Sequence, residues 1–191
     1  MSTPPQPQPP SPIVYMSFTA KVTDQNTSHL MNAVAAYLTQ GMAELHLLLS
    51  TPGGSVMHGM TLYNYLSALP IKLFTYNIGN VDSIGAIVFL AGEERFACPH
   101  STFMLHPVAI PMQQTYEEPD LKAIGQSLLA DQARIASIYA ERSGSQKQDA
   151  LALFDQQKTY SAAEAKRFKF VHEVKPLVIA NGARVYHLNV F

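Results

Sequence analysis

A glycine pair follows a short apolar run near residue 50, where backbone N–H groups could face a ligand. Leu45-His46-Leu47-Leu48-Leu49 leads into Ser50-Thr51-Pro52-Gly53-Gly54-Ser55, and a helical apolar pattern begins at Val56. Glycine lets the backbone approach a ligand closely, and N–H groups at the start of a helix are free donors. A plain turn capped by Ser55 explains the same residues. No lysine follows the glycines, which excludes a P-loop.

Ser83 stands at the next place where an apolar strand gives way to a helix. The local sequence is Gly79-Asn80-Val81-Asp82-Ser83-Ile84-Gly85-Ala86. A serine at such a junction exposes its hydroxyl, and small residues behind it let the helix pack closely, as a nucleophile elbow requires. Val81 occupies the first glycine position of G-x-S-x-G, however. Asp82 or Ser83 could simply cap the helix.

A nucleophilic serine needs a base within hydrogen-bond reach, and His106 is the candidate. It ends the apolar run Phe103-Met104-Leu105-His106-Pro107, which a neighbouring strand could place beside Ser83. A purely structural histidine would fit the same position. The other histidines lack metal-ligand spacing and Cys98 is the single cysteine. We therefore expect no metal and no other cofactor.

Composition narrows the class of protein. The chain has 191 residues, 47% hydrophobic and 14% charged, with a formal net charge of -1. It has no basic cluster for nucleic acid or an anionic membrane, no apolar run long enough to span a bilayer and no signal peptide, so we expect a cytoplasmic protein. The proline-rich residues 1–12 are expected to form a disordered leader, and residues 13–191 a single domain.

Alternating apolar runs and helical patterns predict an α/β domain with a parallel sheet and right-handed crossovers. Later in the chain, a stripe of apolar residues at helical spacing predicts a long helix over about 119–142. Leu177–Ala180 and Val185–Leu188 flank Asn181-Gly182, a strong turn signal, so we expect a C-terminal β-hairpin over about 174–190.

Four segments, in order and in register, carry a resemblance to a known family. They are S-T-P-G-G-S-V, G-N-V-D-S-I-G-A, F-M-L-H-P and S-A-A-E-A. Together they resemble the proteolytic subunit of Clp protease, ClpP, between about Tyr15 and Val174. The resemblance implies a ClpP/crotonase-like fold with β-β-α type crossovers, in which the helix over about 119–142 is a protruding handle.

The resemblance also implies a serine endopeptidase that hydrolyses peptide bonds through an acyl-enzyme. By position, Ser83 matches the nucleophile and His106 the general base, while Gly54 and Ile84 match the two backbone donors of the oxyanion hole. Substrates would be peptides or unfolded proteins. The implied assembly is a homo-oligomeric ring, a hexamer or heptamer and possibly stacked, to which an AAA+ unfoldase could dock.

Three positions depart from the family pattern. The triad aspartate of the family falls on Gln157, and the nearest carboxylate is Asp155, which we take as the candidate third member. Asp82 stands beside the nucleophile where alanine is usual. The family's G-L-V-D stretch reads Lys169-Phe170-Val171-His172. These departures indicate a divergent member.

Two other interpretations remain. Loss of the orienting carboxylate could leave a catalytically impaired ring subunit or scaffold. A crotonase-type acyl-CoA enzyme would share the oxyanion hole, but it does not need Ser83 and His106 together.

The apolar stripe of the long helix bears on assembly. It exceeds what one small domain is expected to cover, so we expect it to form the subunit interface. Its members are Leu121, Ile124, Leu128, Ile135 and Ile138.

Overall fold

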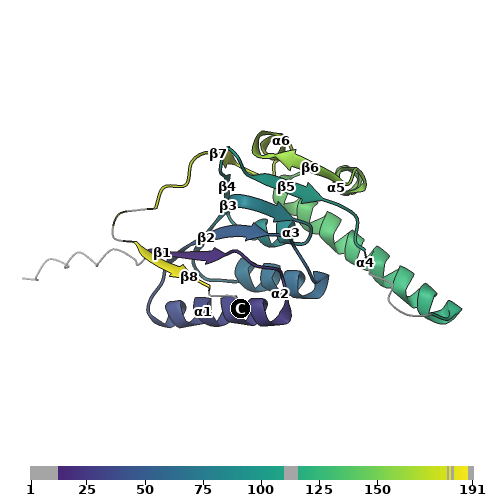
Figure 1. Cartoon of the computed structure of the whole chain (residues 1–191), viewed down its shortest axis with the longest axis horizontal. Helices are drawn as coiled ribbons and strands as arrows, with labels where there is room; N and C mark the ends of the chain where they lie inside the picture. Colours follow the sequence, from purple (N-terminus) through teal and green to yellow (C-terminus); the bar gives the residue numbers. More distant parts are fainter. Residues whose placement is uncertain (1–12, 110–115, 180, 182, 189–191) are drawn as a thin grey trace, which may run out of the picture.

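The computed structural model describes residues 13–109, 116–179, 181 and 183–188. Its centre is a mixed sheet with the strand order β6-β5-β3-β2-β1-β8, in which β4 pairs with β3 and β7 (Figure 1). The strands are β1 (Ile13–Phe18), β2 (Glu44–Thr51), β3 (Lys72–Asp82), β4 (Glu94–Ala97), β5 (Thr102–Leu105), β6 (Lys158–Ser161), β7 (Glu173–Val174) and β8 (Arg184–His187). All described pairings are parallel except that of β5 with β6. The predicted α/β class is confirmed.

The helices lie between and beside these strands. They are α1 (Asp24–Thr39), α2 (Val56–Ser67), α3 (Gly85–Phe89), α4 (Glu118–Ser143), α5 (Lys147–Asp155) and α6 (Ala162–Arg167). The main apolar core gathers buried residues of β1, β2 and β3 with those of α1, α2 and α3. The short helix α3 is buried along its whole length, because every one of its residues is apolar or glycine.

Strand β3 changes partner along its length, and this positions the site. Its first part pairs with β4 from Phe74 to Asn77, and its last three residues pair with β5. The side-chain amide of Asn77 donates to the carbonyl of Thr102 at 2.7 Å at the fork. As a result the end of β3, with Asp82, lies directly beside Met104 of β5.

Helix α4 extends away from the sheet, as expected of the handle (Figure 1). Its start carries a capping box between Glu117 and Asp120, and its end stops at Gly144, whose φ is 67°. The stripe divides along this helix. Ile135 is buried in the chain's own core and Ile138 packs against it, whereas Ile124 and Leu128 are half-buried and Leu121 is 45% exposed. Leu129, outside the stripe, is 70% exposed. The expectation that Ile135 lies at a subunit interface is therefore wrong, because this side chain is used by the core, and the interface role of the other members stays a prediction.

The expectation of a C-terminal β-hairpin over about 174–190 is also wrong. Strand β7 pairs with β4, whereas β8 runs parallel to β1 in the register Val14↔Arg184 to Ser17↔His187. Strand β1 would otherwise be an edge with unpaired backbone groups, and β8 satisfies them. A turn signal at Asn181-Gly182 reports local backbone preference only, so it could not reveal this distant partner.

The leader over residues 1–12 lies outside the described residues. No helix within the described ranges has the length and apolar character needed to cross a membrane.

Candidate active site

Ser83 occupies a strained turn between β3 and α3. Its φ is 56°, in the left-handed region that costs an L-residue other than glycine on the order of 1–2 kcal/mol. Two backbone hydrogen bonds hold the turn. The N–H of Ser83 donates to the carbonyl of Met104 at 2.7 Å, and the N–H of Ala86 donates to the carbonyl of Ser83 at 3.0 Å. This is the geometry of a nucleophile elbow, as the sequence predicts.

The glycine loop lies against Ser83. A Cβ added to Gly53 would lie 2.7 Å from the Cβ of Ser83, so only glycine allows this approach. Gly54 has a φ of 150°, and a Cβ there would lie 2.3 Å from the carbonyl oxygen of Val22. Val22 clamps the loop from both sides: its N–H donates to Gly53 at 2.8 Å, and its carbonyl accepts from the N–H of Ser55 at 3.0 Å.

The backbone N–H groups of Gly54 and Ile84 are free. Neither makes a hydrogen bond to any residue in the described ranges. Both residues line the same small cavity as Ser83. An unpaired N–H is costly to bury, so two of them beside a serine hydroxyl favour a site where an oxygen ligand completes the bonding.

The cavity has a volume of about 70 Å³ and brings Ser83 and His106 together. Its remaining walls are apolar: Val56, Ile87, Pro107, Val108, Ala109, Ile135 and Phe154. Among the described atoms there is no direct hydrogen bond between the Ser83 hydroxyl and the imidazole, which is common before a substrate tightens the geometry.

The orientation of His106 is set by its own backbone neighbour. Its Nδ1 lies 2.7 Å from the carbonyl oxygen of Pro107. A carbonyl only accepts, so Nδ1 is assigned the proton and donates it to this bond. The lone pair then lies on Nε2, the nitrogen that a general base uses toward a serine hydroxyl.

Asp82 has a role that the sequence alone did not reveal. Its Oδ1 accepts the N–H of Met104 at 3.0 Å, and Met104 in turn accepts from Ser83, so Asp82 ties β5 to the elbow. Burial raises the pKa of the Asp82 carboxyl, and the hydrogen bond from Met104 and positive charge on His106 oppose this shift. The sequence signal for this role was Asp82 itself, at a position where the family usually has alanine.

Asp155 makes no hydrogen bond to His106 within the described ranges. It is the last residue of α5, it is exposed, and its carboxylate makes no hydrogen bond or ion pair within the described ranges. Gln157, at the family's triad position, is also exposed and has a φ of 47°. The described residues contain no cluster of three or more histidine, cysteine, aspartate or glutamate side chains able to hold a metal ion.

Gly54→Ala tests the clamp on the glycine loop. We expect the collision with Val22 to lower the free energy of unfolding by about 1–3 kcal/mol more than left-handed strain alone does. Urea denaturation measures it. Gly41→Ala is the matched control, because Gly41 has a φ of 81° and no atom within 4 Å of an added Cβ. Equal losses in the two variants would contradict the packing.

Comparisons with known proteins agree with this geometry. The family model described as Clp protease matches residues 13–176. The chain is 28% identical to ATP-dependent Clp protease proteolytic subunit 1 of Leifsonia xyli over 172 residues, covering 85% of this chain and 84% of that one. It is also 28% identical to proteolytic subunit 2 of Corynebacterium glutamicum over 141 residues, covering 73% and 68%.

A solved structure supports the fold. A ClpP1 mutant from Listeria monocytogenes superposes with a TM-score of 0.77 at 18% identity, covering 84% of this chain and 90% of that one. The expected ClpP-like fold is thus confirmed. With its family match spanning most of its length, the chain belongs to the Clp protease family.

Proposed function

We propose that this protein is a serine endopeptidase in which Ser83 is the nucleophile and His106 the general base. The observation that carries the proposal is the convergence on one cavity of a strained serine, a histidine with a free Nε2 and two unpaired backbone N–H groups. An acyl-CoA enzyme would use the two donors but has no need of the serine and histidine beside them.

The steps follow from these groups. The Oγ of Ser83 attacks the carbonyl carbon of a peptide bond while Nε2 of His106 takes the hydroxyl proton. The N–H groups of Gly54 and Ile84 donate to the oxyanion of the tetrahedral intermediate. The C–N bond then breaks as Nε2 returns the proton to the departing amine. Water, deprotonated by the same nitrogen, hydrolyses the acyl-enzyme and restores Ser83.

The proposed third group is the carbonyl of Pro107. It holds Nδ1 in the required tautomer at 2.7 Å, although it brings no negative charge to stabilise the imidazolium. Asp155, the candidate from the sequence, makes no hydrogen bond to this nitrogen within the described ranges. A carbonyl in place of a carboxylate predicts slower turnover than an intact triad gives.

Assembly into a ring is proposed as well. The outer part of α4 presents Leu121 and Leu129 without partners in the described part of the chain, and a second copy would cover them. Six or seven copies would enclose the active sites, so only unfolded chains would enter. The curated relatives are named as subunits of ATP-dependent proteases, and we propose an unfoldase ATPase as the partner.

Labelling with a fluorophosphonate probe tests the nucleophile. We expect peptide mapping to find the adduct on Ser83, and Ser83→Ala to abolish both labelling and peptidase activity. Ser55→Ala is the control, because Ser55 caps α2 in the neighbouring loop and should lose about 1 kcal/mol of stability but keep labelling. Full activity in Ser83→Ala would overturn the assignment, and a folded chain that is never labelled would favour the scaffold.

The identity of the group that orients His106 is tested by Asp155→Asn. If the Pro107 carbonyl orients His106, kcat should stay within about threefold of the wild type, since no contact is lost. Gln157→Ala should behave in the same way and serves as the matched control. A fall on the order of 10⁴ in kcat for Asp155→Asn alone would instead establish the carboxylate as the orienting residue.

The ring is tested by light scattering after size exclusion. We expect a mass well above that of one 21.0 kDa chain, and Leu121→Glu/Leu129→Glu to reduce it to smaller species. Gln126→Glu/Ser127→Glu adds the same charge to the same helix without removing apolar surface, so it should remain assembled. A wild-type monomer would refute the ring, and an assembled double leucine variant would move the interface elsewhere.

A further inference from the structure

A second cavity, which shares no lining residue with the one at Ser83, gathers positive charge. It has a volume of about 350 Å³ and lies where the end of α4 and the segment after α6 meet β4. Its lining consists of Arg95, Arg142, Ser143, Lys166, Lys169, Val171 and His172. Four of the 13 lysines and arginines of a sparsely charged chain therefore surround one hollow, and no acidic residue of the described ranges lines it.

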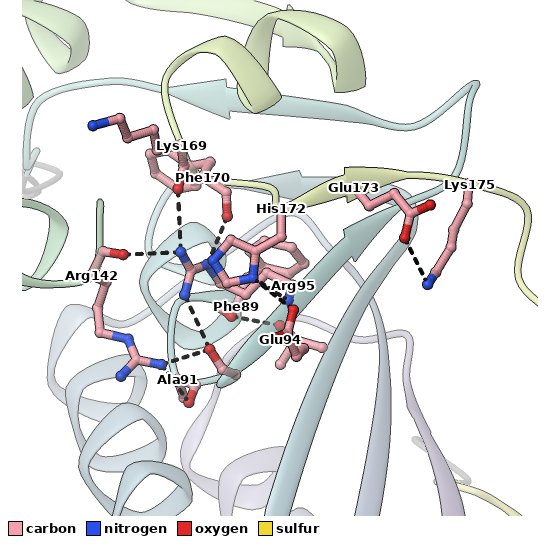
Figure 2. A network of polar contacts seen from close by, with 12 residues as sticks. Phe89, Ala91, Glu94, Arg95, Arg142, Lys169, Phe170, His172, Glu173 and Lys175 are labelled. Carbon is pink, nitrogen blue, oxygen red and sulfur yellow. Dashed lines mark hydrogen bonds and ion pairs between the residues drawn. The ribbon is translucent and has the colours of Figure 1, made fainter. Parts of the chain in front are cut away.

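Arg95 forms the floor and is held by backbone carbonyls. It is only 2% exposed, and it donates to the carbonyls of Gly92, Arg142, Lys169 and Phe170 at 2.8–3.3 Å (Figure 2). Burial, followed by the nearby charge of Arg142, lowers the pKa of Arg95 to about 10. Carbonyl dipoles satisfy its donors, but among the described residues no carboxylate forms an ion pair with it.

The guanidinium of Arg142 has one nitrogen that makes no hydrogen bond within the described ranges. Its Nε donates to Leu90 at 2.8 Å and its Nη2 to Gly92 at 2.6 Å, which places the guanidinium at the carbonyl end of α3. Its Nη1 makes no hydrogen bond to any described residue, so it remains available to an added ligand.

Two lysines complete the positive rim. Lys166 and Lys169 are exposed, and neither ammonium group forms a hydrogen bond or ion pair within the described ranges. The φ of Lys169 is 62°, a strained value that turns its carbonyl onto Arg95. A residue with this φ is most often glycine, so Lys169 carries a backbone cost here.

His172 lines the same cavity. Its Nδ1 lies 3.3 Å from the backbone nitrogen of Arg95, and burial lowers the pKa of the imidazole. Glu94 lies 3.1 Å from the same Nδ1, outside the cavity lining. Neither Lys166 nor Lys169 forms an ion pair with it or with any other described carboxylate.

We propose that this cavity binds a phosphate or pyrophosphate group of a small ligand. Arg142 at the end of α4 and Lys166 and Lys169 in and after α6 bring three cationic side chains to one cavity, a pattern suited to an anion with three or more oxygens rather than to one carboxylate. The volume leaves room for more than one phosphate group.

Isothermal titration calorimetry on the full chain tests the site, with inorganic phosphate and pyrophosphate as probes and sodium chloride at matched ionic strength as the blank. We expect saturable binding of one anion per chain, tighter for pyrophosphate. Lys166→Gln/Lys169→Gly should weaken it at least about tenfold, because two charge-assisted contacts are lost while glycine keeps the left-handed turn.

Lys21→Gln/Lys122→Gln is the matched control, since both lysines are exposed and their ammonium groups have no partner among the described residues. It should bind pyrophosphate as the wild type does. Binding no stronger than the salt blank, or unchanged in the Lys166/Lys169 variant, would overturn the proposal. Acetate binding as tightly as phosphate would overturn the proposal in favour of a carboxylate site. A change of assembly mass in that variant, with no phosphate binding by the wild type, would overturn it in favour of a contact between subunits. Ser83 does not line this cavity, so Ser83→Ala should bind pyrophosphate as the wild type does, whether or not the protein is a peptidase.

Discussion

The left-handed turn at Ser83 is the constraint on which the site depends. A serine would not adopt this backbone on its own, so neighbouring elements must hold it. Met104 holds it from β5 by accepting the N–H of Ser83, and Gly53 fills the opposite side at a distance that no side chain allows. The same turn leaves the N–H of Ile84 unpaired beside that of Gly54. Nucleophile and oxyanion donors thus arise from one backbone conformation.

The fork in β3 makes this turn possible. By leaving β4 and joining β5, the strand places Asp82 where its carboxylate can accept from Met104, and it carries Ser83 to the start of α3. The other end of α3 is held by Arg142, which donates to carbonyls there. The short buried helix is therefore fixed at both ends, and the ends of α3 and α4 are joined through polar contacts.

Ser83 and His106 could be chosen from the sequence because each follows a recognisable apolar strand, whereas Gly54 and Ile84 were assigned as oxyanion donors through the resemblance to the family. The sequence could not place their partners. The bond from Nδ1 of His106 to its neighbour Pro107 depends on backbone geometry, and the pairing of β8 with β1 joins segments 170 residues apart. The cationic cavity could not be predicted from the sequence, because its charged residues are scattered along the chain and meet only after folding. They are Arg95, Arg142, Lys166 and Lys169.

A crystal structure of the protein with a peptide boronic acid would test the central claim most directly, because the tetrahedral boronate resembles the oxyanion intermediate. The account predicts a bond between boron and Oγ of Ser83, with one boronate oxygen within hydrogen-bond distance of both the Gly54 and Ile84 nitrogens. A boronate attached to Ser83 whose oxygens accept from neither N–H group, or one attached to another residue, would contradict it.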